Sequence, residues 1–298
     1  DGKVTLSGLE ERGIRMQNGT LNVNSSADLR IEDAGTAILL RNTFTHTFDG
    51  TISIILMSLD GIALEAAVQI DIPASAMIDI DTIQFDPIYL DDVGAIININ
   101  GTLDLAEADD GIDVEDGTMN VGATANINIH DVTDNGIEVM TGTNSGTITI
   151  SNTGDDGINT ASGTFTNNAS GTITISNVAD RCIDVENSED FNNSGTIIAS
   201  ECGNFVIEGG TFNNLANGLV QADGSIESSA YVAAANSILA PGQSPGCLEF
   251  DSGEDFSNST IRIEIEGTTP CAEYDQIMLA DVFTLTDATL ELSGSYVP

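Results

Sequence analysis

An alternating pair of apolar residues recurs about every 24 residues along most of this chain. The pairs begin at Ile14, Ile38, Ile62, Ile88, Ile112, Ile137, Ile158, Ile183 and Phe205. The intervals between these residues range from 21 to 26. A period sustained in this way indicates a repeat architecture, because so short a repeat cannot bury its apolar side alone and must stack on its neighbours.

Each period holds about three short strands and no helix. The run Gly-Thr-Ile-Thr-Ile occurs at 146–150 and again at 171–175. A pair of asparagines comes directly after Phe191 and after Phe212, and another pair comes one residue later after Phe165. Alternation places one side chain inside and the next outside. A propeller blade needs ~40 residues, and a leucine-rich repeat needs a leucine frame. The pattern therefore predicts an all-β, right-handed parallel β-helix in which the phenylalanines and asparagines stack.

The predicted solenoid has about nine turns over residues 1–235, followed by a second region. Residues 1–235 carry the repeat, and residues 236–298 form a β-rich continuation or cap in which the texture of the sequence changes. Glycine, asparagine and aspartate separate the strands and can adopt the positive φ that tight corners require.

The charge balance limits the partners. The chain has 47 acidic and seven basic residues, a formal net charge of −40. Nucleic acid is excluded, since its phosphates must be neutralised by lysine or arginine. Anionic membranes are disfavoured for the same reason. No stretch approaches the roughly 20 apolar residues of a membrane span, so we expect no direct membrane insertion.

Four cysteines, Cys182, Cys202, Cys247 and Cys271, indicate the compartment. None forms a C-x-x-C pair and the chain has only two histidines, which disfavours a zinc site. Their spacings of 20 and 24 residues are about one turn each, which favours Cys182–Cys202 and Cys247–Cys271 among three connectivities. Two disulfides predict an oxidising, extracellular or cell-surface location. A start at Asp1 within a strand-like run, without a signal peptide, is typical of a mature or trimmed fragment.

The region 238–296 carries a family resemblance. It contains Pro-Gly-Gln-Ser-Pro-Gly at 241–246, Ile-Arg-Ile-Glu-Ile-Glu-Gly at 261–267, Tyr-Asp-Gln-Ile-Met-Leu at 274–279 and a strand-like run at 283–292. This order resembles the C-terminal portion of bacterial autotransporter passengers and related adhesin β-helices. The cysteines at 247 and 271 depart from that pattern. The resemblance implies an exported, surface-displayed or secreted protein of bacterial origin, and it supplies no ligand.

Acidic residues recur at equivalent places in successive periods. One set precedes the repeat glycines: Asp60, Asp86, Asp109, Asp110, Asp134, Asp155, Asp156 and Asp180. A second set, Asp113, Glu138, Asn159 and Asp184, falls on the outward face of the strands. Stacked carboxylates about 5 Å apart repel by about 1 kcal/mol per solvated pair, which Ca²⁺ would offset. We predict a Ca²⁺ column at Asp109, Asp110, Asp134, Asp155, Asp156 and Asp180; the alternative is a solvated acidic face.

Catalytic readings are weaker. A lyase acting on acidic glycans needs basic residues, and the chain has only seven. A glycosidase needs two carboxylates ~5–9.5 Å apart, a condition that any stacked acids meet. We expect His46 to be a strand surface residue rather than a ligand. The predicted function is therefore an extracellular structural or adhesive solenoid (a stalk, surface-display or filament segment) that binds itself, surface glycans or proteins, with no catalysis. The alternative is a glycan-binding or glycoside-hydrolysing β-helix.

Overall fold

The computed structural model describes residues 2–227, 229–243 and 245–296, apart from the side chains of residues 187 and 188. All of its regular elements are β-strands. The strands form a parallel β-solenoid of about eleven turns with a spacing of ~24 residues, which confirms the predicted fold class. The chain divides into two compact units, unit 1 (Asp1–Gly154) and unit 2 (Asp155–Pro298). The described residues include no helix long and apolar enough to cross a membrane.

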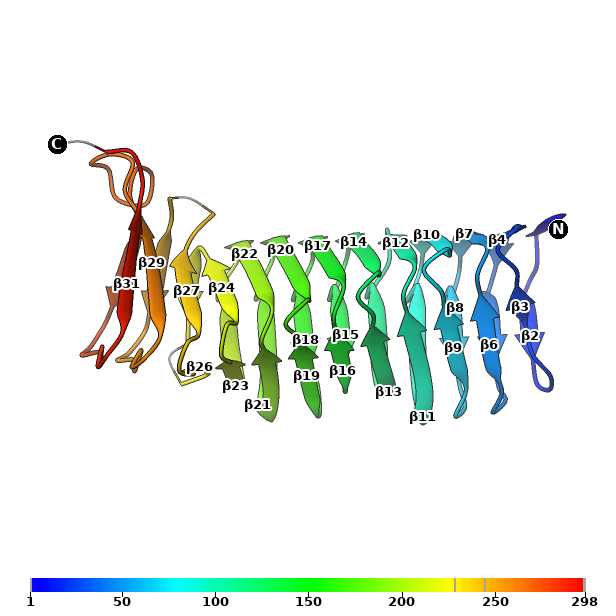
Figure 1. Cartoon of the computed structure of the whole chain (residues 1–298). Coiled ribbons are helices and arrows are strands. Elements are labelled where there is room, and N and C mark those ends of the chain that lie inside the picture. The colour runs from blue at the N-terminus through cyan, green and yellow to red at the C-terminus, as the bar shows by residue number, and fades with distance from the viewer. Residues whose placement is uncertain (1, 228, 244, 297–298) are drawn as a thin grey trace. The chain divides into compact units, whose positions relative to one another are not determined.

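Unit 1 consists of three parallel ladders, and most of their strands are labelled in Figure 1. The first contains β1 (Gly2–Ser7), β4 (Ala27–Ala34), β7 (Thr51–Met57), β10 (Met77–Ile83), β12 (Thr102–Ala106), β14 (Asn126–Val132) and β17 (Thr147–Thr153). The second contains β2 (Arg12–Met16), β5 (Thr36–Leu40), β8 (Ile62–Leu64), β11 (Ile88–Ile99), β13 (Ile112–Val121) and β15 (Ile137–Val139). The third contains β3 (Asn22–Val23), β6 (Thr45–Phe48), β9 (Gln69–Ile72), the distal parts of β11 and β13, and β16 (Gly142–Asn144).

Unit 2 repeats this arrangement. Its first ladder contains β20 (Thr172–Val178), β22 (Thr196–Cys202), β24 (Leu219–Ala222), β27 (Ile238–Pro241), β29 (Thr260–Glu264) and β31 (Thr289–Ser293). The second contains β18 (Ile158–Thr160), β21 (Ile183–Asn193), β23 (Ile207–Asn214), β25 (Gly224–Ile226), β28 (Cys247–Phe250) and β30 (Gln276–Leu279). The third contains β19 (Thr164–Asn167), the distal parts of β21 and β23, and β26 (Tyr231–Ala233).

Register explains the core. Along the first ladder of unit 1 the same inward position is occupied by Ile31, Ile54, Ile80, Leu105, Ile129 and Ile150, paired turn to turn and fully buried. A one-residue slip would turn this whole column towards solvent, so the apolar alternation fixes the register.

Aromatic and amide side chains stack in the third ladder of unit 2, as the sequence predicts. The ring centroids of Phe165 and Phe191 lie 5.2 Å apart, and those of Phe191 and Phe212 lie 5.1 Å apart. Two residues further along each strand, Asn167 Nδ2 donates to Asn193 Oδ1 and Asn193 Nδ2 donates to Asn214 Oδ1, both at 2.9 Å. All six side chains are fully buried, so this amide ladder satisfies polar groups inside the core.

In eight of the turns, one corner has a left-handed backbone at a residue other than glycine, whereas Gly8 takes the equivalent place after β1. This corner lies at the end of the first-ladder strands, where φ is positive at Asp33, Leu56, Thr82, Glu107, Asp131, Asn152, Asn177 and Glu201. Asparagine and aspartate adopt this conformation readily, whereas leucine, threonine and glutamate do so at a cost of about 1 kcal/mol or more.

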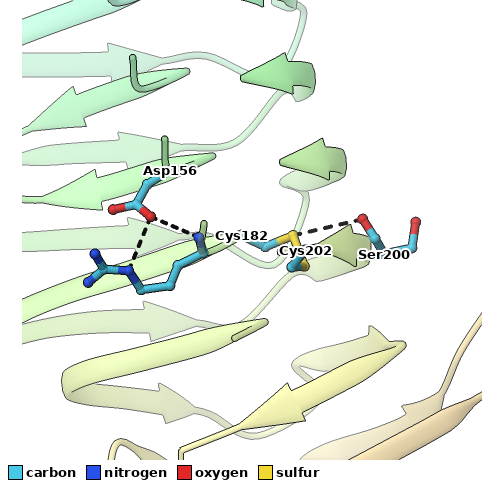
Figure 2. Close-up of a disulfide and its surroundings, with 5 residues drawn as sticks. Asp156, Cys182, Ser200 and Cys202 are labelled. Carbon is cyan, nitrogen blue, oxygen red and sulfur yellow. Dashed lines mark hydrogen bonds and ion pairs between the residues drawn. A yellow bond between two sulfur atoms is a disulfide. The ribbon is translucent and has the colours of Figure 1, made fainter. Parts of the chain in front are cut away.

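Both disulfides join neighbouring turns. Cys182 pairs with Cys202 across a Cα separation of 5.4 Å, and Cys247 pairs with Cys271 across 5.0 Å. These are the two pairings that the one-turn spacing favours, and no described cysteine is free. Figure 2 shows the first bridge, with Asp156 on the adjoining turn.

His46 differs from its expected place. Its side chain is fully buried, so the prediction of a strand surface residue is wrong. Position 46 has the same parity as the buried Phe48 and therefore faces inward. The imidazole Nδ1 accepts the Leu21 N–H at 2.9 Å, and Nε2 lies 3.1 Å from Asn42 Oδ1. Burial lowers the pKa of His46, so this ring is a neutral core group.

A carboxylate corner as the candidate functional site

The corner that precedes the second-ladder strands is held by buried aspartates. Asp86 Oδ1 accepts the backbone N–H of Asp110 at 3.1 Å, and Asp110 Oδ1 accepts that of Asn135 at 2.7 Å. In unit 2, Asp156 Oδ1 accepts the backbone N–H of Arg181 at 2.9 Å. Each carboxylate thus satisfies the N–H of the equivalent residue one turn later, which explains why aspartate recurs at this point of the repeat.

The acids predicted to form one Ca²⁺ column occupy two. Asp110 and Asp156 are buried, while Asp109, Asp134, Asp155 and Asp180 are half-buried. The outer column stacks in register within each unit, since Asp134 N–H bonds the carbonyl oxygen of Asp109 and Asp180 N–H bonds that of Asp155, both at 3.1 Å. Sequence spacing indicated the stacking but did not separate the inner column from the outer one.

The second acidic set is less exposed than expected. Asp113 lies opposite Glu138 and Asn159 lies opposite Asp184, so the residues pair as predicted within each unit. However, Asp113 is only 9% exposed and Asp184 only 6% exposed. The expectation of a solvated outward face is therefore wrong for Asp113 and Asp184, which are buried.

Arg181 organises the acids of unit 2. It contacts four carboxylates: Asp184 at 2.7 Å, Asp180 at 2.8 Å, Asp156 at 3.3 Å and Glu208 at 3.4 Å. Three of them, Asp156, Asp184 and Glu208, border a polar groove of about 580 Å³, which is lined also by Asp155, Asn159, Glu186, Gly209 and Glu227. Sequence analysis did not single out Arg181, although a lone base amid acids that recur at one-turn spacing is a detectable signal.

Only part of the predicted metal set converges. Among the described residues, Asp155, Asp156 and Asp180 form the group of three whose ligand oxygens lie within 4.8 Å of one another. Asp109, Asp110 and Asp134 form no such group. Oxygen ligands suit Ca²⁺, but the Arg181 guanidinium already lies against Asp156 and Asp180. A metal there would have to displace it, so calcium at these three residues stays a prediction.

Burial dominates the electrostatics of the inner column. Burial, together with the charge of nearby carboxylates, raises the pKa of Asp110 and that of Asp113 to about 8. The pKa of Asp86 rises to about 7 for the same reasons. Burial also raises the pKa of Asp156 to about 7, although the N–H and charge of Arg181 oppose the rise. These carboxyls bind protons near neutral pH, unlike ordinary surface aspartates.

This column predicts an unusual dependence of stability on pH. The raised pKa values mean that the folded chain binds more protons than the unfolded chain between about pH 4 and pH 8, so the free energy of unfolding falls as pH rises through this window. Each pKa unit per group is worth about 1.4 kcal/mol. In chelator, we expect a higher melting temperature at pH 5 than at pH 8 by circular dichroism. Asp110→Asn should reduce the difference between the melting temperatures at pH 5 and pH 8. A melting temperature that rises from pH 5 to pH 8 would contradict the prediction.

The chain was compared with protein-family models, curated proteins and solved structures, and none of the three comparisons gives a match. The parallel β-solenoid is supported by the structure, whereas membership in the autotransporter or adhesin class has no support from a relative.

Proposed function

We propose that this chain is a structural element of an exported or surface-displayed protein: a β-solenoid that acts as a stalk, spacer or display segment. The observation that carries the proposal is the in-register repetition of the same side chains within each unit. Buried isoleucine columns, the phenylalanine stack and the asparagine ladder all join successive turns. Repetition of this kind builds a scaffold whose stability is the sum of neighbouring contacts.

Two further features support the proposed role. The disulfides suit an oxidising compartment. The dense negative charge keeps the surface soluble and repels other anionic macromolecules. In this role the partners would be a second copy of the chain, surface glycans or surface proteins.

A glycoside hydrolase is the competing proposal, because Asp156, which lines the groove of unit 2, and the neighbouring Asp180 have carboxyls with divergent pKa values. The pKa of Asp156 is raised to about 7, whereas that of Asp180 is lowered, since hydrogen bonds from Asn204 and Arg181 outweigh its burial. A general acid must reach the glycosidic oxygen. Asp156 is only 1% exposed and is bound by Arg181, so it is poorly placed to do so.

The structural proposal and the enzymatic proposal predict different results when the protein is tested for polysaccharide hydrolysis. The oxidised protein is incubated with a panel of neutral and acidic polysaccharides, and new reducing ends and unsaturated uronates are measured. We expect no turnover, together with the same protease resistance before and after incubation. Hydrolysis that disappears in both Asp156→Asn and Asp180→Asn would sink the structural proposal and favour the enzyme. Glu249→Gln, which changes an exposed acid on β28 away from the groove, is the control variant.

A further inference from the structure

Four positions around the carboxylate corner correspond between the two units. In unit 1 they are Asp86, Asp110, Asp113 and Glu138; in unit 2 they are Asp156, Arg181, Asp184 and Glu208. The correspondence is structural. In each unit the first residue accepts the backbone N–H of the second, at 3.1 Å and 2.9 Å respectively. In each unit the third also pairs in register with the fourth on the neighbouring strand.

The two sets differ at the second position, where unit 1 has Asp110 and unit 2 has Arg181. In unit 2 the guanidinium lies within 3.4 Å of a carboxylate oxygen of each of the other three residues. The corner of unit 1 has four carboxylates, and the charges that act on the pKa of Asp86, Asp110 and Asp113 are those of other acidic residues. Fully ionised, the four carboxylates carry two more negative charges than the set in unit 2, and one divalent cation makes up that difference.

Asp113 adds an observation that does not depend on the count of acids. Its side chain is nine-tenths buried, and its Oδ1 has no hydrogen-bond partner. The charges of Asp86, Glu138, Asp110 and Glu115 all act to raise its pKa. A buried oxygen without a donor costs free energy unless a cation or a proton satisfies it. The corresponding Asp184 Oδ2 receives the Arg181 Nη1–H at 2.7 Å.

We propose that Asp86, Asp110, Asp113 and Glu138 bind a divalent cation, with Ca²⁺ as the best fit, in the place that the Arg181 guanidinium takes in unit 2. Carboxylate oxygens from neighbouring strands suit its flexible coordination, whereas Mg²⁺ demands near-octahedral geometry. The side chains must converge on the ion, since no three of their oxygens lie as close as those of Asp155, Asp156 and Asp180. We therefore expect a dissociation constant on the order of 10⁻⁴–10⁻³ M, as in extracellular modules. The site does not depend on the proposed structural role.

Tyr89 makes this site observable by itself. Tyr89 pairs with Asp113 on the adjoining strand, and it is the sole tyrosine of residues 1–154 in a chain without tryptophan. Tb³⁺ replaces Ca²⁺ at oxygen sites and emits when a nearby tyrosine is excited. Titration of the whole chain with Tb³⁺ should give saturable emission that Ca²⁺ displaces, and Tyr89→Phe should remove the emission.

Two variants decide the proposal. Asp113→Asn should weaken Tb³⁺ and Ca²⁺ binding at least tenfold. Asp110→Arg, which copies unit 2, should abolish binding and raise the melting temperature in chelator. Glu10→Gln, an exposed acid of unit 1, should change neither. Absence of a saturable emission that Tyr89→Phe removes, or survival of this Tyr89-dependent emission in both corner variants, would overturn the proposal. If Asp113→Asn fails to fold, Asp110→Arg alone still tests it.

Discussion

Replacing Arg181 with alanine is expected to lower the free energy of unfolding of unit 2 by about 3–5 kcal/mol. The guanidinium contacts Asp156 and Asp184, which are 1% and 6% exposed. Removal of one partner from a buried ion pair leaves the other charge buried without compensation, which is the costly case. Urea unfolding at pH 8, followed by circular dichroism and tyrosine fluorescence, measures this loss of stability. Urea is used because it is uncharged and does not screen the ion pairs.

Arg262→Ala is the matched control. Arg262 pairs with Glu291 at 2.8 Å, but their side chains are 45% and 52% exposed. An exposed pair of this kind contributes about 0–1 kcal/mol, so its loss should be small. Equal losses for the two variants would show that the Arg181 cluster behaves as a surface ion pair. At pH 5, the loss in free energy of unfolding caused by Arg181→Ala should be smaller than at pH 8, because protonation of Asp156 removes part of the uncompensated charge.

Phe191→Ala is the second variant with a large expected effect, a loss of about 3–5 kcal/mol. Phe191 is fully buried between Phe165 and Phe212. The backbone ladders on both sides hold the neighbouring turns at a fixed spacing, so the cavity cannot collapse readily. The melting temperature and the urea midpoint of the oxidised chain measure the effect.

Phe283→Ala serves as the comparison for this variant, because Phe283 is 40% exposed and lies outside the stack. It should cost less than about 1 kcal/mol. Phe191→Leu should recover much of the stability by refilling the volume. A loss below 1 kcal/mol in Phe191→Ala would mean that the turns close over the missing ring and that the stack contributes little to the solenoid.

The repeat made the fold predictable because, in a solenoid, the length of the repeat determines the register between the strands of successive turns. A pair such as Ile112 and Val114 recurs at the spacing of one turn, and this spacing alone determines which residue of the next turn lies beside it. The stacks at Phe191 and Asn193 follow from the same rule. The cysteine pairings also needed only the length of a turn.

Exposure was not predictable in the same way. Alternation assigns Asp113 and Asp184 to the outer side of the strand, yet both are buried. His46 shows the reverse error, since its polarity indicated the surface and its parity placed it in the core. The role of Arg181 depends on three turns meeting at one point, a condition that no local pattern expresses. The fold could therefore be predicted from the length of the repeat, whereas the candidate site could be identified only in the three-dimensional structure.

The left-handed corner at the end of the first-ladder strands has a consequence for how such a chain can change. Leu56 and Thr82 occupy it with φ near +60°, where glycine or asparagine would relax the backbone. Turns in which this position is not yet Asn, Asp or Gly therefore hold an unused reserve of stability. Substitutions to Asn, Asp or Gly at this corner, one turn at a time, could offset destabilising substitutions elsewhere. The corner therefore offers compensating substitutions at several places along the chain.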